Sequence, residues 1–127
     1  MTGVQTCALP ISHDILTVVQ FIRTSDRPSK RLDAVAVDGA GPWLAAARAV
    51  ARGAIDRAAL DTGGFRFSQV RDLHSPDFLP GGAKYLDLPG MLAAESGTVW
   101  VTGETAATGS PYATAKREEL VEKLLKN

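Results

Sequence analysis

The chain has few of the residue types that most often mark a function. It has 127 residues but only one cysteine, Cys7, and two histidines, His13 and His74. One cysteine gives no pattern from which a disulfide framework could be read, and two histidines leave little room for a histidine-based metal site. We therefore expect neither a metal nor a cofactor.

A surplus of charge of one sign and long apolar runs are also missing. Lys plus Arg and Asp plus Glu both number 14, so the net charge is zero and nothing electrostatic favours a nucleic-acid partner. No stretch approaches the roughly 20 apolar residues of a membrane span, so we expect no membrane partner either. With 45% hydrophobic residues, the chain is typical of a globular protein, as one domain or part of one.

The first twelve residues, MTGVQTCALPIS, differ from everything downstream. They carry no charged side chain and no helical or strand periodicity, whereas a secretory signal would need a basic front before Ser12. Residues 2–11, TGVQTCALPI, instead resemble the codon-by-codon translation of a common sequencing adapter. This resemblance implies that residues 1–11 are an artefact, that the natural sequence begins near Ser12, and that Cys7 is foreign to it.

The rest of the chain predicts alternating helices and strands. Apolar patterns and turn residues indicate a helix with its N-cap at Ser12, strands at residues 32–38 and 54–61, a helix at 42–53, a short helix ending near 96, a strand at 97–104, and a final helix that starts at Ser110 and Pro111. Residues 62–90, rich in glycine and proline, are expected to form a long irregular connection. Such alternation predicts an α/β fold with three layers, a parallel sheet covered by helices on both faces.

The first and last helices are expected to bury one apolar face each. The first helix is expected to bury Ile15, Val18, Val19 and Ile22. The last is expected to bury Leu120, Val121, Leu124 and Leu125, and to pair Glu119 with Lys123 and Glu122 with Lys126 on its exposed side.

The turn after the first strand, in VAVDGAGPWLAAARA, is where an open parallel sheet would bind a ligand. One interpretation is a dinucleotide site, because Gly39 and Gly41 imitate the start of G-x-G-x-x-G and Asp61 follows at about the expected interval. Tyr112 and Lys116 likewise stand at the spacing of the Tyr-x-x-x-Lys pair of short-chain dehydrogenases. Against this interpretation, a leucine replaces the third glycine, and no serine stands at the usual interval before Tyr112.

The other interpretation is a nucleophile elbow, a strained strand-to-helix turn that presents an attacking side chain between small neighbours. Residues 36–40, Ala-Val-Asp-Gly-Ala, fit such a turn, with Asp38 at the nucleophile position. From Ser12 onward the chain resembles the C-terminal half of α/β-hydrolases, above all bacterial dienelactone-hydrolase-like and acetyl-xylan-esterase-like proteins, in the segments HDILT, DGAGPWLAAARAVARGAIDRAALDTGGFRF and FLPGGAKYLDLPGMLAAESGTVWVTGE. The resemblance implies an incomplete α/β-hydrolase fold over residues 12–127. It also implies a small-molecule or carbohydrate ester as the substrate of the parent protein.

The resemblance further implies a catalytic triad, from which this sequence departs. Asp38 stands where the family has its nucleophilic serine, or Gly39 does if the turn is shifted by one residue; a carboxylate can still attack and form a covalent intermediate. The acid would be Glu104, just after the last strand. No histidine follows Glu104, so His74 would be an unorthodox base, and His13 is expected at the start of a helix, on its solvent side or capping it.

Structural roles compete with each catalytic one. Asp38 could simply end the strand and cap the following helix, Glu104 could be a solvated loop residue, and His74 could bond to backbone. Phe65 and Phe67 are expected to tuck the long connection onto the sheet.

Loss of the part before Ser12 would also remove function. That part would supply the second oxyanion donor, and losing one such donor costs about a hundred- to a thousandfold in rate. We therefore expect the chain to be inactive as it stands, either as a piece of an esterase or as part of a non-catalytic pseudo-hydrolase scaffold. Its first strand would keep an unpaired edge.

Overall fold

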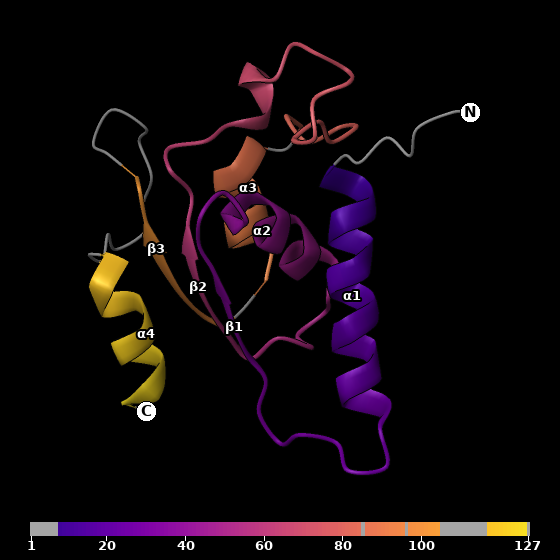
Figure 1. The fold of residues 1–127 in the computed structure, drawn as a ribbon, viewed down its shortest axis with the longest axis vertical. Helices are drawn as coiled ribbons and strands as arrows, with labels where there is room; N and C mark the ends of the chain where they lie inside the picture. Colours follow the sequence, from indigo (N-terminus) through magenta and orange to yellow (C-terminus); the bar gives the residue numbers. More distant parts are fainter. Residues whose placement is uncertain (1–7, 85, 96, 105–116, 127) are drawn as a thin grey trace.

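Three parallel strands form the centre of the molecule (Figure 1). The computed structural model describes residues 8–84, 86–95, 97–104 and 117–126. In that part of the chain the strands β1 (Asp33–Ala36), β2 (Arg57–Asp61) and β3 (Thr98–Thr102) pair in the order β1-β2-β3. The helices are α1 (Ala8–Thr24), α2 (Gly41–Val50), α3 (Asp87–Ala93) and α4 (Arg117–Leu125), with a short 3₁₀ helix, η1 (Phe67–Gln69). The predicted α/β fold with a parallel sheet is confirmed.

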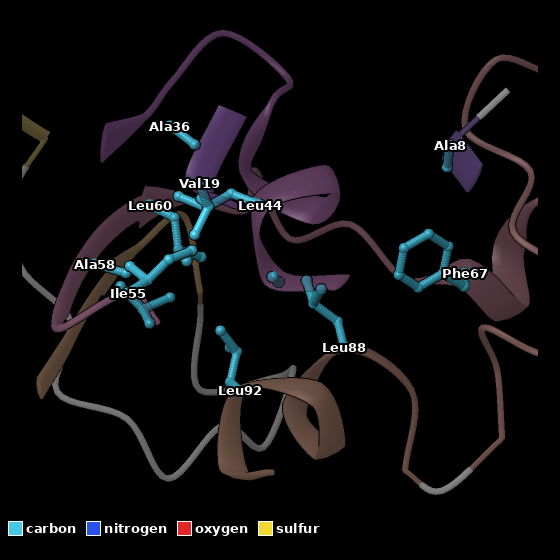
Figure 2. Packing of buried hydrophobic residues seen from close by; sticks show 12 residues of the cluster. Ala8, Val19, Ala36, Leu44, Ile55, Ala58, Leu60, Phe67, Leu88 and Leu92 are labelled. Carbon is cyan, nitrogen blue, oxygen red and sulfur yellow. The ribbon is translucent and has the colours of Figure 1, made fainter. Parts of the chain in front are cut away.

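The central strand, β2, is buried between two layers of helices. Ala58 and Leu60 are fully buried in a cluster that includes residues of α1, α2 and α3, which Figure 2 shows. Ala59 points the other way and is buried with Leu120 and Leu124 of α4. A parallel strand with both faces covered needs no polar alternation, which explains the apolar sequence of this segment. The sheet therefore lies between α1–α3 on one face and α4 on the other (Figure 1).

Helix α1 begins at Ala8, and the prediction that Ser12 is its N-cap is wrong. Ser12 lies inside the helix, buried, and its hydroxyl donates to the carbonyl oxygen of Trp43 at 3.3 Å. Ala8 is fully buried, and its N–H donates to the carbonyl oxygen of Phe78 at 3.3 Å. Residues 8–11, which belong to the segment that resembles a translated adapter, thus form the first turn of α1.

Three apolar side chains that were expected in the core are exposed: Val18 by 57%, Val121 by 48% and Leu125 by 79%. The apolar seam of α4 is narrower than the periodicity indicated, because only Leu120 and Leu124, one turn apart, are buried against the sheet. The two ion pairs predicted on this helix do form, with the Lys123 and Lys126 amines 4.0 Å and 3.3 Å from Glu119 and Glu122 respectively. The predicted start of the last helix, Ser110 and Pro111, lies outside the described residues.

Arg23 ties α1 to the amino end of the sheet. It donates to the carboxylate of Asp56 at 2.6 Å and to the carbonyl oxygen of Ala54 at 2.9 Å. The same Asp56 oxygen accepts the N–H of Leu32 at 2.6 Å, just before β1. The Leu32 N–H and the Arg23 guanidinium together hold the pKa of Asp56 below its ordinary value of 3.8.

Arg57, at the start of β2, contacts three other elements. Its Nε donates to Asp33 of β1 at 3.0 Å, and its Nη2 donates to the carbonyl oxygen of Leu124 in α4 at 2.7 Å. Its guanidinium also lies over the ring of Trp100 in β3, 5.9 Å from the centroid. The hydrogen bond from Arg57 lowers the pKa of Asp33. One side chain thereby joins both outer strands and the C-terminal helix to the central strand.

The long connection after β2 is partly structured, and a buried carboxylate organises it. Asp87, at the start of α3, accepts the N–H groups of Phe67 at 2.8 Å, Ser68 at 2.9 Å and Leu88 at 2.7 Å. The first two of these bonds join η1 to α3. Phe67 is buried and meets the ring of Phe65 edge to face, with the centroids 5.0 Å apart, so the two aromatic residues do fasten the connection to the core.

Candidate active site at the carboxyl edge of the sheet

The turn from β1 to α2 has a strained backbone. Asp38 has a φ of +54° and Gly39 a φ of +90°, and the N–H of Ala40 donates back to the carbonyl oxygen of Val37 at 3.1 Å. A left-handed conformation costs most residues other than glycine about 1–2 kcal/mol, and aspartate less, because its short polar side chain can hydrogen-bond locally. The strained residue, Asp38, is exposed.

Close packing of α2 against β2 fixes this turn. Gly41, the first residue of α2, is buried, and a Cβ atom there would lie 1.9 Å from the carbonyl oxygen of Asp61. Pro42 follows in the first turn, where its fixed φ suits the start of a helix. The N-cap residue of α2 is Ala40, so Asp38 does not occupy the cap position.

Glu104 follows β3 and is buried, so the interpretation of it as a solvated loop residue is wrong. Its side chain is 2% exposed. Its Oε1 accepts the Thr62 hydroxyl at 2.5 Å and Arg66 Nη1 at 3.1 Å, and its Oε2 accepts Arg66 Nη2 at 2.6 Å. The Glu104 carboxylate raises the pKa of the Arg66 guanidinium. These bonds tie the end of β3 to the segment that follows β2.

Two glycine turns, after β2 and after β3, pack directly on each other at this edge. A Cβ atom on Gly103 would lie 2.4 Å from the backbone nitrogen of Gly63 and 2.6 Å from Asp61 Oδ1. That Asp61 oxygen accepts the N–H of Gly63 at 2.9 Å. In a dinucleotide site the equivalent carboxylate would receive a ribose hydroxyl, whereas here it stabilises its own turn. Tyr112 and Lys116, the second part of the dinucleotide interpretation, lie outside the described residues.

A pocket of about 330 Å³ lies beside the strained turn. It is lined by Gly39, Pro42, Trp43, Thr62, Phe65, Pro76 and Asp77. Its size suits a small ligand. Two lining residues adjoin the candidate catalytic residues. Gly39 follows Asp38 in the chain, and the Thr62 hydroxyl donates a hydrogen bond to Glu104.

Neither histidine lines this pocket. His74 is 81% exposed in the long connection, where its N–H donates to Asp72 Oδ1 at 2.9 Å and its ring Nδ1 lies 3.3 Å from the same oxygen. His13 is exposed on α1 and borders a different pocket, between α1 and α2. In the part of the chain that the structure describes, the wall of this pocket therefore contains no histidine base.

Thr62 and Arg66, the partners of Glu104, were not among the predicted site residues. The sequence did contain a signal for them. The segment TGGFRF places a hydroxyl and a cation directly after the second strand, and the loops after parallel strands converge at the carboxyl edge of a sheet.

Within the described ranges, no group of three or more His, Cys, Asp or Glu side chains could hold a metal ion. The helices found there are too short or too polar to cross a lipid bilayer. No family model, no curated protein and no solved structure matches the chain. The functional argument therefore depends on the geometry of the carboxyl edge.

Proposed function

We propose that this chain carries the nucleophile turn of an α/β-hydrolase-like ester hydrolase, with Asp38 at the nucleophile position. The supporting observation is the φ of +54° at Asp38, an exposed residue between the end of β1 and the buried start of α2. A nucleophile elbow needs a strained residue at this place in the fold. Open parallel sheets also bind their ligands at this edge, and the 330 Å³ pocket lies there.

In the proposed chemistry the Asp38 carboxylate attacks the acyl carbon of a small ester bound in the pocket, the ester C–O bond breaks, and the departing alkoxide takes a proton from the solvent. Water then attacks the acyl carbon of the resulting mixed anhydride, the bond to Asp38 breaks, and the acid leaves with the hydroxyl of that water while its other proton goes to a base. The second step needs a base to accept a proton from water. Because neither histidine lines the pocket, we expect attack by Asp38 but no efficient turnover in this chain.

A non-catalytic scaffold is the second candidate, favoured by the contacts of Glu104. Both carboxylate oxygens of Glu104 accept hydrogen bonds from Arg66, and one also accepts the Thr62 hydroxyl. A carboxylate held in this way supports the edge of the sheet rather than orienting a histidine. Such a protein would bind a small ester in the same pocket without cleaving it.

Selective labelling of Asp38 by an epoxide probe, located by peptide mass spectrometry, tests the proposal. We expect Asp38 to be labelled about tenfold faster than Asp26, an exposed carboxylate in the loop after α1 and therefore a matched control. Asp38→Asn should abolish this label. Equal labelling of Asp38 and Asp26 would contradict a nucleophile role.

Hydrolysis of p-nitrophenyl acetate separates the two candidates. We expect the wild-type chain to release a burst of about one equivalent of p-nitrophenolate and then to match the rate in buffer, because attack by Asp38 needs no base whereas the second step does. Asp38→Ala should show no burst. A rate above buffer that Asp38→Ala removes would exclude the non-catalytic scaffold. Saturable binding of the ester to an Asp38→Asn variant, without labelling of the wild type, would favour it.

A further inference from the structure

Strand β1 is an open edge of the sheet in the described part of the chain, where it pairs with β2 alone. The carbonyl oxygen of Leu32 accepts the N–H of Asp56 at 2.9 Å, so alternate residues from Leu32 onward direct their backbone groups toward β2. The backbone groups of Asp33 and Val35 therefore point to the open side. β1 contains no proline or lysine of the kind that usually protects an edge from pairing.

An apolar groove of about 530 Å³ runs between this edge and α1. Val18 of α1 and Val35 of β1 both line it, and they are 57% and 46% exposed. Phe21, a neighbour of Val18 on the surface of the helix, is 72% exposed. Figure 1 shows α1 standing alongside the sheet, with β1 as the outer strand. Unpaired backbone and exposed apolar side chains thus occur together on one side of the molecule.

We propose that the open edge of β1 and this groove bind a second copy of the chain. The two β1 strands pair antiparallel about a two-fold axis perpendicular to the sheet, with Ala34 at the axis. Asp33 of each copy then exchanges backbone hydrogen bonds with Val35 of the other. The same axis directs Val18 and Phe21 of the two α1 helices toward each other. Because this interface is self-complementary, the assembly closes at two copies.

Charge complementarity favours this occupant and fixes the direction of pairing. Lys30 precedes β1 and Asp38 follows it, at equal separations from Ala34 along the chain, and both are exposed. Antiparallel pairing brings Lys30 of each copy to Asp38 of the other, whereas parallel pairing would place like charges together. The net charge of zero leaves no overall repulsion between copies.

Sedimentation velocity over a range of concentrations tests the proposal on the full chain. We expect a monomer–dimer equilibrium. Val35→Asp should raise the dimer dissociation constant at least about tenfold, because it places a second carboxylate opposite Asp33 of the other copy at a desolvated edge. Val121→Asp is the matched control, since Val121 is 48% exposed but lies on α4 and does not line the groove, and it should leave the constant unchanged.

Further variants keep the proposal testable if Val35→Asp fails to fold. Phe21→Lys alters only the exposed side of α1 and should also weaken the dimer. Lys30→Glu should weaken it, and adding Asp38→Lys should restore it. The proposal is overturned by a monomer at every concentration, by equal effects of Val35→Asp and Val121→Asp, or by species that grow beyond a dimer. A monomer that instead captures an extended apolar peptide in the groove would also overturn it.

Discussion

Removal of the Glu104 carboxylate should destabilise the fold strongly. In Glu104→Ala the Arg66 guanidinium, 13% exposed, loses a partner at 2.6 Å, and the Thr62 hydroxyl loses one at 2.5 Å. Breaking a buried ion pair from one side typically costs about 3–5 kcal/mol. Arg66 keeps a bond to the carbonyl oxygen of Phe65 at 2.7 Å, so we expect the lower end of that range, about 3 kcal/mol.

Urea unfolding followed by circular dichroism measures this loss in the free energy of unfolding. The double substitution Glu104→Met with Arg66→Leu should recover most of it, because an apolar pair of similar size leaves no buried charge. Glu122→Ala is the control: Glu122 pairs with Lys126 on the surface, where the two side chains are 66% and 75% exposed, and should cost less than about 0.5 kcal/mol. A loss below about 1 kcal/mol in Glu104→Ala would refute the inference that this carboxylate ties β3 to the segment after β2.

Two further predictions concern single residues. Asp38→Gly should raise the free energy of unfolding by about 0.5–1 kcal/mol, because glycine adopts a positive φ freely but loses more entropy on folding. Arg52 has a φ of +51°, so Arg52→Gly should raise the free energy of unfolding by as much. If neither variant raises it, these turns are unstrained. Asp56, whose pKa is lowered by the Leu32 N–H and by Arg23, contributes stability that is complete above its ordinary value of 3.8 and is lost as pH falls through the lower folded value. The melting temperature, measured between pH 2 and 7, should therefore fall less steeply at acid pH in Asp56→Asn than in the wild type. Identical falls in the two proteins would contradict a stabilising role for the Asp56 carboxylate.

Local sequence patterns predicted the strands because each strand is a short apolar run bounded by turn residues. All three observed strands lie inside the predicted ranges of 32–38, 54–61 and 97–104. The turn at Asp38 could also be located from its glycines, whereas the positive φ that makes it unusual appears only in the structure.

Contacts between residues distant in the chain could not be predicted in this way. Thr62 and Glu104 are 42 positions apart, and nothing local to either indicates their hydrogen bond. Arg48 lies in an alanine-rich helix with nothing local to indicate its burial, yet it is 1% exposed and donates to the carbonyl oxygens of Leu92 and Glu95 near the end of α3. Ser12 was misjudged for the same reason, since its bond to a distant carbonyl replaces the local capping bond. Tertiary packing determines the burial and the hydrogen-bond partners of each of these residues.

The central strand offers α4 little more than the methyl group of Ala59, whereas Ala58 and Leu60 face α1–α3 on the other side. Helix α4 can approach this strand closely, yet it gains only a small apolar area from it. Much of the attachment of α4 consequently falls on Arg57, at the amino end of the sheet. Disruption should then begin at that corner, with α4 detaching while the strands remain paired.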